Sequence, residues 1–441
     1  MAVAIGSEKK NYSLIIAFFG YFVMKIRSLL LYLLIIAIAL SPTLFLGTSS
    51  GLQKNIDIRV EDIFLIIIVV VSAICFLINK IRVINRPPLF IPIVLWTTFG
   101  LFSLLVNIFL GNVYWLRGFF YFLKEIEFFL IYFFVYYSVK NESMIFKSIK
   151  LWVILGTANI GYVLYQIFTG QRRGEYGTAA IGEWGVFPTG AFFLIIFIFL
   201  LNFYLYHHKR LEISPAKQIL IITAIISLIL GVFGSASKTN FLGLFFAVLV
   251  ILVVYVLKKK SIKVLLLGGL ALVFMVGIFL FALERIPDAS RLLYVLNLNQ
   301  LFLNYDAGRF TGAIVPQFTE AIRHPFLMII GFGKGAILVY QESHNQYLRN
   351  LVETGLIGSV LFLLLIWAII KKSWAGFNQK TDNLSVGLSA GLLTATLTML
   401  FLSFATEPFI VVKPSEVYWF FTGLTTAAKS LNNRKVAANY E

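Results

Sequence analysis

Long apolar runs make up most of the chain, and short polar connections separate them. Many of the runs hold about 20 residues, which is the length that an α-helix needs to cross a bilayer. Backbone amides in lipid must be hydrogen-bonded within their own segment, so the runs are expected to be helices. The pattern predicts about twelve spans, at residues 28–46, 63–78, 89–109, 119–138, 151–168, 186–206, 217–234, 239–257, 263–282, 350–370, 384–405 and 414–428.

These spans divide the chain into three predicted regions. Residues 1–282 hold nine spans, residues 283–349 form the longest polar interval, and residues 350–441 hold three spans and a tail. The expected fold is therefore all-α: a polytopic integral membrane protein with one large loop between two membrane regions.

An apolar residue recurs at every fourth position inside the large loop, at Phe310, Ile314, Phe318 and Ile322. This spacing predicts an amphipathic helix that lies on the membrane surface. We expect Pro316 to bend this helix and Pro325 to end it, because proline cannot continue the helical hydrogen bonding.

The composition agrees with a membrane protein. Hydrophobic residues make up 59% of the chain and charged residues 13%, whereas soluble domains carry about 25% charged residues. A net charge of +17 would suggest a nucleic-acid partner in a soluble protein. In a membrane protein basic residues fix the orientation, so no nucleic acid is expected. The single cysteine, Cys75, excludes an internal disulfide.

The distribution of basic residues predicts the orientation. If the N-terminus is inside, most of the 37 basic residues fall in connections that are also inside. This excess alternates along the whole chain, so both termini are expected in the cytoplasm. The large loop is then extracytoplasmic, which excludes ATP as its substrate.

Several basic residues break this rule, because they lie in connections predicted to be outside. They are Arg172 and Arg173 before the sixth span, Lys238 before the eighth, and Arg309, Arg323 and Arg349 in the large loop. Gathered together, they would bind an anion with several oxygens, since the planar fork of arginine donates two parallel hydrogen bonds. Alternatively, each one contacts solvent or lipid headgroups. As a set, Arg173, Lys238 and Arg309 favour an anion site.

His344 is the sharpest candidate for a catalytic side chain. It lies in Ser343-His344-Asn345-Gln346, close to the start of the tenth span. An imidazole can take a proton from a hydroxyl near neutral pH. The alternative is a polar helix cap, because Ser343 and Asn345 are good N-cap residues. Glu342 could act as the base or orient the imidazole, but a solvated loop carboxylate is the favoured interpretation.

Charged residues inside the fourth span form a second candidate feature. Lys124, Glu125 and Glu127 lie in its outer part, and Lys124 and Glu127 are spaced to pair on one helix. Charge in a bilayer is costly and is usually paired or turned to a cavity. The residues indicate either a structural pair or a proton path, and the pair is the simpler reading.

Glycines punctuate the end of the large loop. Gly331-Phe332-Gly333-Lys334-Gly335 lacks the spacing of a nucleotide-binding loop, so a tight turn that re-enters the membrane surface is expected. Gly355 and Gly358 are three residues apart and are expected to permit close helix contact. The sequence contains no histidine, cysteine or aspartate cluster with metal spacing, so neither a metal nor another cofactor is expected.

Five pieces of sequence, in this order and spacing, resemble the superfamily of O-antigen ligases and O-antigen polymerases (Wzy-like proteins). The pieces are Gly308-Arg309, His324-Pro325, Gly331-Phe332-Gly333, Ser343-His344-Asn345-Gln346-Tyr347-Leu348 and Glu353-Thr354-Gly355-Leu356-Ile357-Gly358. Arg173-Gly174 and Ser237-Lys238 are weaker matches upstream. The family usually has arginine where this chain has Lys238, which keeps the charge but loses the fork.

The resemblance implies a GT-C-like membrane glycosyltransferase in the bacterial cytoplasmic (inner) membrane. Its donor would be an oligosaccharide linked to undecaprenyl pyrophosphate, and its acceptor would be a glycan, with a chain-length regulator as a further candidate partner. His344 would deprotonate the acceptor, and Arg309 and Arg173 would hold the pyrophosphate. Lys238, Arg172, Arg323 and Asn345 are the other expected contacts to substrate.

Three functions remain open from the sequence. The first is a polymerase of repeat units for a surface polysaccharide. The second is a ligase that transfers a finished glycan to a lipid core or to protein, with the same fold and site. The third is a flippase or transporter of the lipid-linked glycan, for which Lys124 and Glu127 would matter more than His344.

Overall fold

The structure is a computed structural model. It describes residues 26–41, 43–49, 54–79, 86–170, 178–182, 185–207, 214–259, 315–336, 344–379 and 384–438, together with positions 269 and 277. For the strands up to residue 58 and for parts of some helices only the backbone is described.

Seven helices in the described part are long and apolar enough to cross a membrane. They are α3 (Phe90–Phe109), α5 (Glu142–Thr169), α6 (Val186–His207), α7 (Pro215–Gly234), α8 (Lys238–Lys259), α15 (Gln346–Phe377) and α16 (Leu384–Leu402). Each one covers a predicted span, which agrees with a polytopic membrane protein.

Four more predicted spans coincide with helices that carry more charge or are shorter. They are the helix Ile26–Leu40, α2 (Val60–Asn79), α4 (Trp115–Ser138) and α17 (Val412–Ala438). In α4 the interruptions are the charged residues Arg117, Lys124, Glu125 and Glu127. The predicted span at 263–282 lies outside the described residues.

An antiparallel pair of strands corrects the end of the predicted first span, whereas the other elements of the described chain are helices, as predicted. The first helix ends at Leu40 instead of continuing to residue 46. Strand β1 (Thr43–Ser49) then pairs with β2 (Lys54–Arg59), from Thr43 opposite Arg59 to Ser49 opposite Lys54. Ser41 has a φ of 40°, which ends the helix. Threonines, which favour strands, follow it.

The described part of the large loop holds two short helices. Helix α12 (Val315–Arg323) contains Pro316 in its first turn, where a proline needs no bonded amide. Helix α13 (Pro325–Ile330) starts at the proline that was expected to end the preceding helix. His324 lies between them with φ −119° and ψ 79°, so the prediction that the helix ends there is confirmed.

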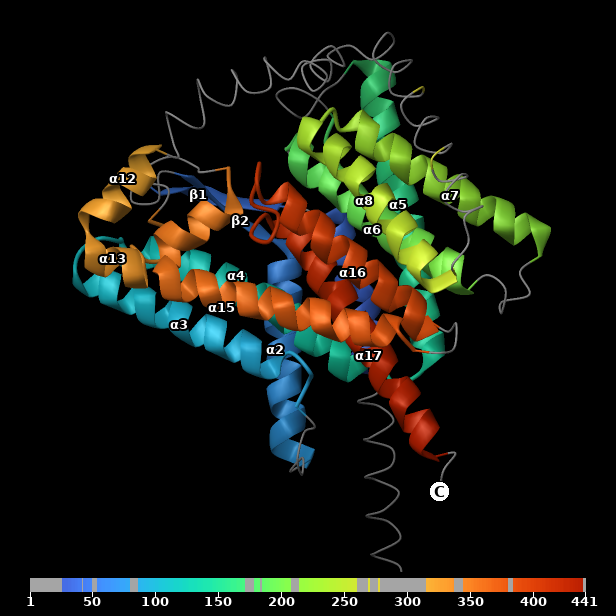
Figure 1. Cartoon of the computed structure of the whole chain (residues 1–441), viewed down its shortest axis with the longest axis horizontal. Coiled ribbons are helices and arrows are strands. Elements are labelled where there is room, and N and C mark those ends of the chain that lie inside the picture. Colours follow the sequence, from blue (N-terminus) through green and yellow to red (C-terminus); the bar gives the residue numbers. More distant parts are fainter. Residues whose placement is uncertain are drawn as a thin grey trace, which may run out of the picture.

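Helices α6, α16 and α17 form the centre of the molecule. Most of α6 and α16 is buried, and α16 packs against α6, α8 and α15. The ring of Phe199 on α6 stacks on Phe421 of α17, with 4.1 Å between their centroids. In Figure 1, α3, α4, α13 and α15 lie on one side of this centre and α5, α7 and α8 on the other.

The connections between helices contact one another in two separate groups. At one end, Lys413 Nζ donates to the carbonyl of Ile181, and Thr178 Oγ1 donates to the carbonyl of Gly234. At the other end, Lys258 Nζ donates to the carbonyl of Phe377. The first group comes from connections predicted to be outside and the second from connections predicted to be inside, as an alternating topology requires.

Candidate functional site

The predicted catalytic histidine lies at the start of α15. His344 is half-buried and has a φ of 48°, a left-handed conformation that is uncommon for residues other than glycine. Asn345 follows as the N-cap, and its Oδ1 accepts a hydrogen bond of 3.0 Å from the amide of Leu348. The capping prediction for Asn345 is therefore confirmed. The left-handed backbone of His344 turns the chain immediately before α15 begins.

Two hydrogen-bonded groups fix this helix start to the connection between α16 and α17. Asn345 Nδ2 donates to the carbonyl of Phe404 at 3.1 Å. The amide of Gln346 lies 3.0 Å from the carbonyl of Ser403 and 3.1 Å from that of Thr406. Both functional groups of the Asn345 side chain thus bond within the protein. Its expected contact with substrate stays a prediction.

The other predicted site residues fall into two classes. Arg172, Arg173 and Arg309 lie outside the described residues. Lys238 is the half-buried first residue of α8, and Arg323 is the exposed last residue of α12, 3.6 Å from Glu320. Lys238 and Arg323 therefore come from separate elements, and their roles in substrate binding stay predictions.

The glycine-rich segment after α13 forms the predicted turn, and this turn is buried in the protein. Residues 331–336 are all buried, and Gly331, Gly333 and Gly335 have φ values of 84°, 89° and 82°. A Cβ on Gly331 would lie 2.5 Å from the backbone of Glu353. Only glycine satisfies both the positive φ and this close approach.

The turn fills a break in α15. Gly355 interrupts the helix with φ 66° and ψ −168°, which leaves carbonyls before it without their usual helical partners. The amide of Phe332 donates to the carbonyl of Val352 at 2.7 Å, and the amide of Gly333 donates to that of Glu353 at 3.0 Å. These bonds satisfy backbone carbonyls that the interrupted helix would otherwise leave buried without a partner.

This break corrects the expectation for the two helix glycines. A Cβ on Gly355 would lie 2.3 Å from the carbonyl oxygen of Ile329, so Gly355 admits the loop backbone and does not lie on a regular helix face. Gly358 does lie against a neighbouring helix, because its Cβ would be 3.4 Å from the ring of Phe99 on α3.

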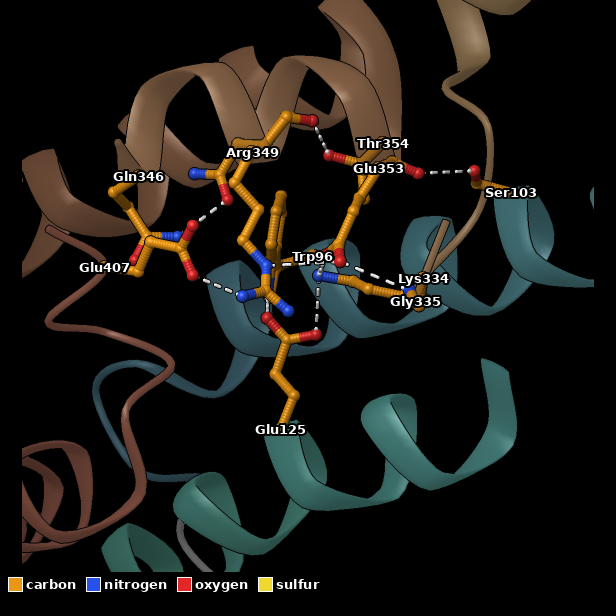
Figure 2. Close-up of polar contacts among 11 residues, drawn as sticks. Trp96, Ser103, Glu125, Lys334, Gly335, Gln346, Arg349, Glu353, Thr354 and Glu407 are labelled. Carbon is orange, nitrogen blue, oxygen red and sulfur yellow. Dashed lines mark hydrogen bonds and ion pairs between the residues drawn. The ribbon is translucent and has the colours of Figure 1, made fainter. Parts of the chain in front are cut away.

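Two buried cations meet at the turn. Lys334 is 2% exposed and Arg349 is 6% exposed. Lys334 Nζ lies 2.9 Å from Glu125 Oε2, and Arg349 Nε lies 3.2 Å from Glu353 Oε1. Arg349 also pairs with Glu407 in the connection after α16. Figure 2 shows Arg349 between its two carboxylates, with Glu125 reaching up from α4.

Aromatic rings and one backbone amide complete this network. Lys334 Nζ lies 4.7 Å from the ring centroid of Trp96, and the Trp96 indole donates to Glu125 at 2.6 Å. The amide of Gly335 donates to Glu353 Oε1 at 3.2 Å. Because Glu353 bonds both the turn and Arg349, it connects α15 to the glycine-rich segment.

A second group of ion pairs lies near the first, and one pocket contacts both groups. Lys124 pairs with Asp62 at the start of α2 and, at 2.7 Å, with Glu127 one turn along α4. The expected pair of Lys124 and Glu127 is confirmed. The pocket has a volume of about 150 Å³ and contacts both groups; its charged lining residues are Arg59, Asp62, Lys124, Glu125, Lys334, Arg349 and Glu353.

The charges around this pocket are balanced. Each of its lysines and Arg349 already has at least one carboxylate within ion-pair distance. Burying unpaired charges in a low-dielectric site would cost several kcal/mol each, and pairing offsets that cost. The pocket can therefore hold a polar group that replaces one of these partners, but it does not carry a free positive charge for a diphosphate.

Sequence reasoning identified part of this network. It noted Lys124, Glu125 and Arg349, but it missed the roles of Glu353 and Glu407. The predicted topology contained a signal for these two carboxylates. Glu353 lies near the start of the span at 350–370 and Glu407 follows the span at 384–405, so both are on the predicted side of Arg349. The pairing itself depends on the broken helix, which no local pattern reveals.

The chain matches no protein family model, and no protein of curated function matches it significantly. Among the described residues, no group of three or more histidine, cysteine, aspartate or glutamate side chains could hold a metal ion.

Proposed function

We propose that the protein is a membrane glycosyltransferase that joins oligosaccharide repeat units into a surface polysaccharide. The donor is an oligosaccharide on undecaprenyl pyrophosphate, and the reaction takes place on the extracytoplasmic face of the bacterial inner membrane. A twelve-span, GT-C-like arrangement with both termini inside belongs to this proposal. A ligase that uses the same site and transfers the finished glycan is the alternative within the same class.

The observation that carries the proposal is the backbone of His344. Its φ of 48° is strained for a histidine, and anchors follow it immediately at Asn345 and Gln346. Strain of this kind persists only where the surroundings enforce it, and it gathers at functional sites. It supports an imidazole that is presented in one fixed position at the head of a membrane helix.

In the proposed reaction His344 takes the proton of the acceptor hydroxyl. The hydroxyl oxygen forms a bond to the anomeric carbon of the donor while the bond from that carbon to the diphosphate oxygen breaks. The electron pair leaves with the carrier diphosphate. Because the oxygen attacks opposite the leaving group, the configuration inverts. No metal is needed if fixed cations stabilise the growing negative charge.

The cations in that role are the arginines outside the pocket. Lys334 and Arg349 are neutralised by Glu125, Glu353 and Glu407, so they support the scaffold instead of holding the donor. Arg309, Arg173 and Arg172 remain the proposed ligands of the diphosphate, and Lys238 is a further one.

The test is transfer by the purified full-length protein in detergent micelles, with a defined lipid-linked oligosaccharide and gel analysis. The wild type should form a ladder of longer glycans, and His344→Ala should leave single units. His324→Ala is the matched control, since that exposed histidine pairs with Glu320 and lies edge-on to the ring of Phe332, away from the start of α15. A ladder with His344→Ala would contradict the proposed base. A wild-type protein that moves only a finished glycan would identify the ligase.

One observation favours a transporter as the second candidate. Lys124 pairs with Asp62 and Glu127 beside a pocket, and charged residues within an otherwise apolar span often mark the path of a translocated substrate. A transporter makes no new glycosidic bond in micelles, but it moves labelled lipid-linked glycan across proteoliposomes. Lys124→Met should abolish that movement while His344→Ala leaves it unchanged.

A further inference from the structure

We propose that a second pocket, at the opposite end of the bundle, binds a polyol phosphate such as the headgroup of phosphatidylglycerol. This pocket has a volume of about 410 Å³, which lies within the usual range for small-molecule sites. It lies among the ends of α4, α15, α16 and α17. The binding proposed for this pocket does not depend on the proposed glycosyltransferase reaction.

Two lysines at this pocket have no carboxylate partner. Lys372 on α15 and Lys429 on α17 both line it, and neither forms an ion pair with any described residue. The Lys429 ammonium lies 3.3 Å from the backbone carbonyl of Lys372, and its charged neighbour is the Lys372 ammonium itself. Two like charges held close together favour a shared anion. This differs from the balanced pocket at the other end.

A buried hydroxyl adds a free donor. Ser389 on α16 is 1% exposed, lines the pocket, and its Oγ has no hydrogen-bond partner. A buried hydroxyl without a partner is destabilising, so a ligand that accepts from it would relieve that penalty. The two ammonium groups and this hydroxyl together suit the oxygens of a phosphate.

Three other hydroxyls of the pocket already donate within their own helices. Ser373 Oγ donates to the carbonyl of Ile369, Thr425 Oγ1 to that of Phe421, and Thr426 Oγ1 to that of Thr422. Their hydrogens are used, so toward a ligand their oxygens can act as acceptors. A phosphate that also carries hydroxyl groups, as phosphoglycerol does, matches both kinds of group.

The walls of the pocket extend this match to an amphiphile. Pro88, Tyr136 and Leu392 line it beside the polar groups. Basic pockets between membrane helices on the cytoplasmic side commonly bind anionic headgroups. The connections at this end are the ones that the charge pattern predicts to be inside. A membrane lipid and a soluble polyol phosphate share this chemistry, and the experiment distinguishes them.

The test is thermal unfolding of the delipidated full-length protein during titration with three probes. The probes are short-chain phosphatidylglycerol, short-chain phosphatidylcholine and glycerol 3-phosphate, and the shift in Tm gives an apparent Kd. We expect phosphatidylglycerol to raise Tm and phosphatidylcholine to have little effect. Equal protection by glycerol 3-phosphate at similar concentration would identify a soluble ligand. No protection by either phosphoglycerol compound would overturn the proposal.

Two variants locate the site. Lys372→Ala combined with Lys429→Ala should weaken the apparent Kd at least about tenfold, because two charge-assisted contacts are lost. The control, Lys371→Ala with Lys150→Ala, removes the same charge from exposed residues that do not line the pocket. Equal weakening by the control would assign the effect to net charge and overturn the site.

A third variant does not depend on the folding of the double lysine change. Asn433→Asp puts a carboxylate at an exposed lining position, where it should repel the phosphate and weaken binding several-fold. Unchanged binding in this variant would also count against the proposal.

Discussion

Gly331 and Gly355 meet backbone to backbone, and a Cβ on Gly355 would lie 2.5 Å from the amide nitrogen of Gly331. This contact lets the buried turn after α13 reach the broken carbonyl ladder of α15. The turn in turn carries Lys334 to Glu125 on α4. The ion network therefore depends on two positions that have no side chain.

Replacing Gly355 by alanine should destabilise the protein strongly. The new Cβ meets the carbonyl of Ile329 at 2.3 Å, and the φ of 66° adds strain of about 1–3 kcal/mol. We expect a clear fall in Tm by thermal unfolding in detergent. Gly161→Ala is the control, because nothing lies within 4 Å of its Cβ on the exposed side of α5. An equal Tm for both variants would contradict this account.

Arg349→Met should cost about 3–5 kcal/mol of unfolding free energy, because it leaves Glu407 buried without its cation and Glu353 with only Lys334, at 3.7 Å. Adding Glu407→Gln removes one of the stranded charges. The double variant should therefore be less destabilised than the sum of the two single variants. Denaturant unfolding of all four proteins gives this coupling directly. Simple additivity would show that the pair is not energetically linked.

His344 permits a separation of its backbone from its side chain. At a φ of 48°, glycine is free of the strain that alanine retains, which amounts to about 1–2 kcal/mol. His344→Gly should therefore be more stable than His344→Ala, while both lose the imidazole and the proposed transfer activity. Tm and product ladders measured on the same preparations check this. Activity that follows stability instead would point to a structural role.

Asn345→Ala should lower stability by about 1 kcal/mol through loss of the N-cap. It also removes the donor to the carbonyl of Phe404, which anchors the helix start. Asn345→Asp keeps the cap acceptor and loses only that donor, so it should retain most of the stability. If the two variants lose equal stability, the cap is not the important contact.

The helical part of the fold follows from runs of apolar residues. Five of the seven apolar helices begin and end within three residues of the predicted spans, because each run has the length of a bilayer crossing. Helix α5 begins nine residues before its predicted span, and α15 ends seven residues after its own. The length of the first span was overestimated because the prediction relied on apolar residues alone. Leu44, Phe45 and Leu46 are apolar and extended the predicted span to residue 46, but the positive φ of Ser41 ends the helix and the chain turns into strand β1.

The candidate site was predictable only where its chemistry is local. The cap at Asn345, the glycine turn and the pair of Lys124 with Glu127 are each made by residues that are close in sequence. The sequence predicts each of these features. Arg349 with Glu407 and Lys334 with Glu125 join distant segments. These pairs depend on how α15 breaks at Gly355 and on which connections meet, and a hydrophobic pattern contains neither.

The joining of Asn107 to Gly331 has a consequence for biosynthesis. Asn107 Nδ2 donates to the carbonyl of Gly331 at 2.8 Å, across 224 residues of chain. A ribosome adds about 5–20 residues per second, so Gly331 is synthesised about 10–45 s after Asn107. Glu125 waits equally long for Lys334. During translation the early helices therefore carry incompletely matched polar groups, and the insertion machinery must shelter them from lipid until the last third of the chain emerges.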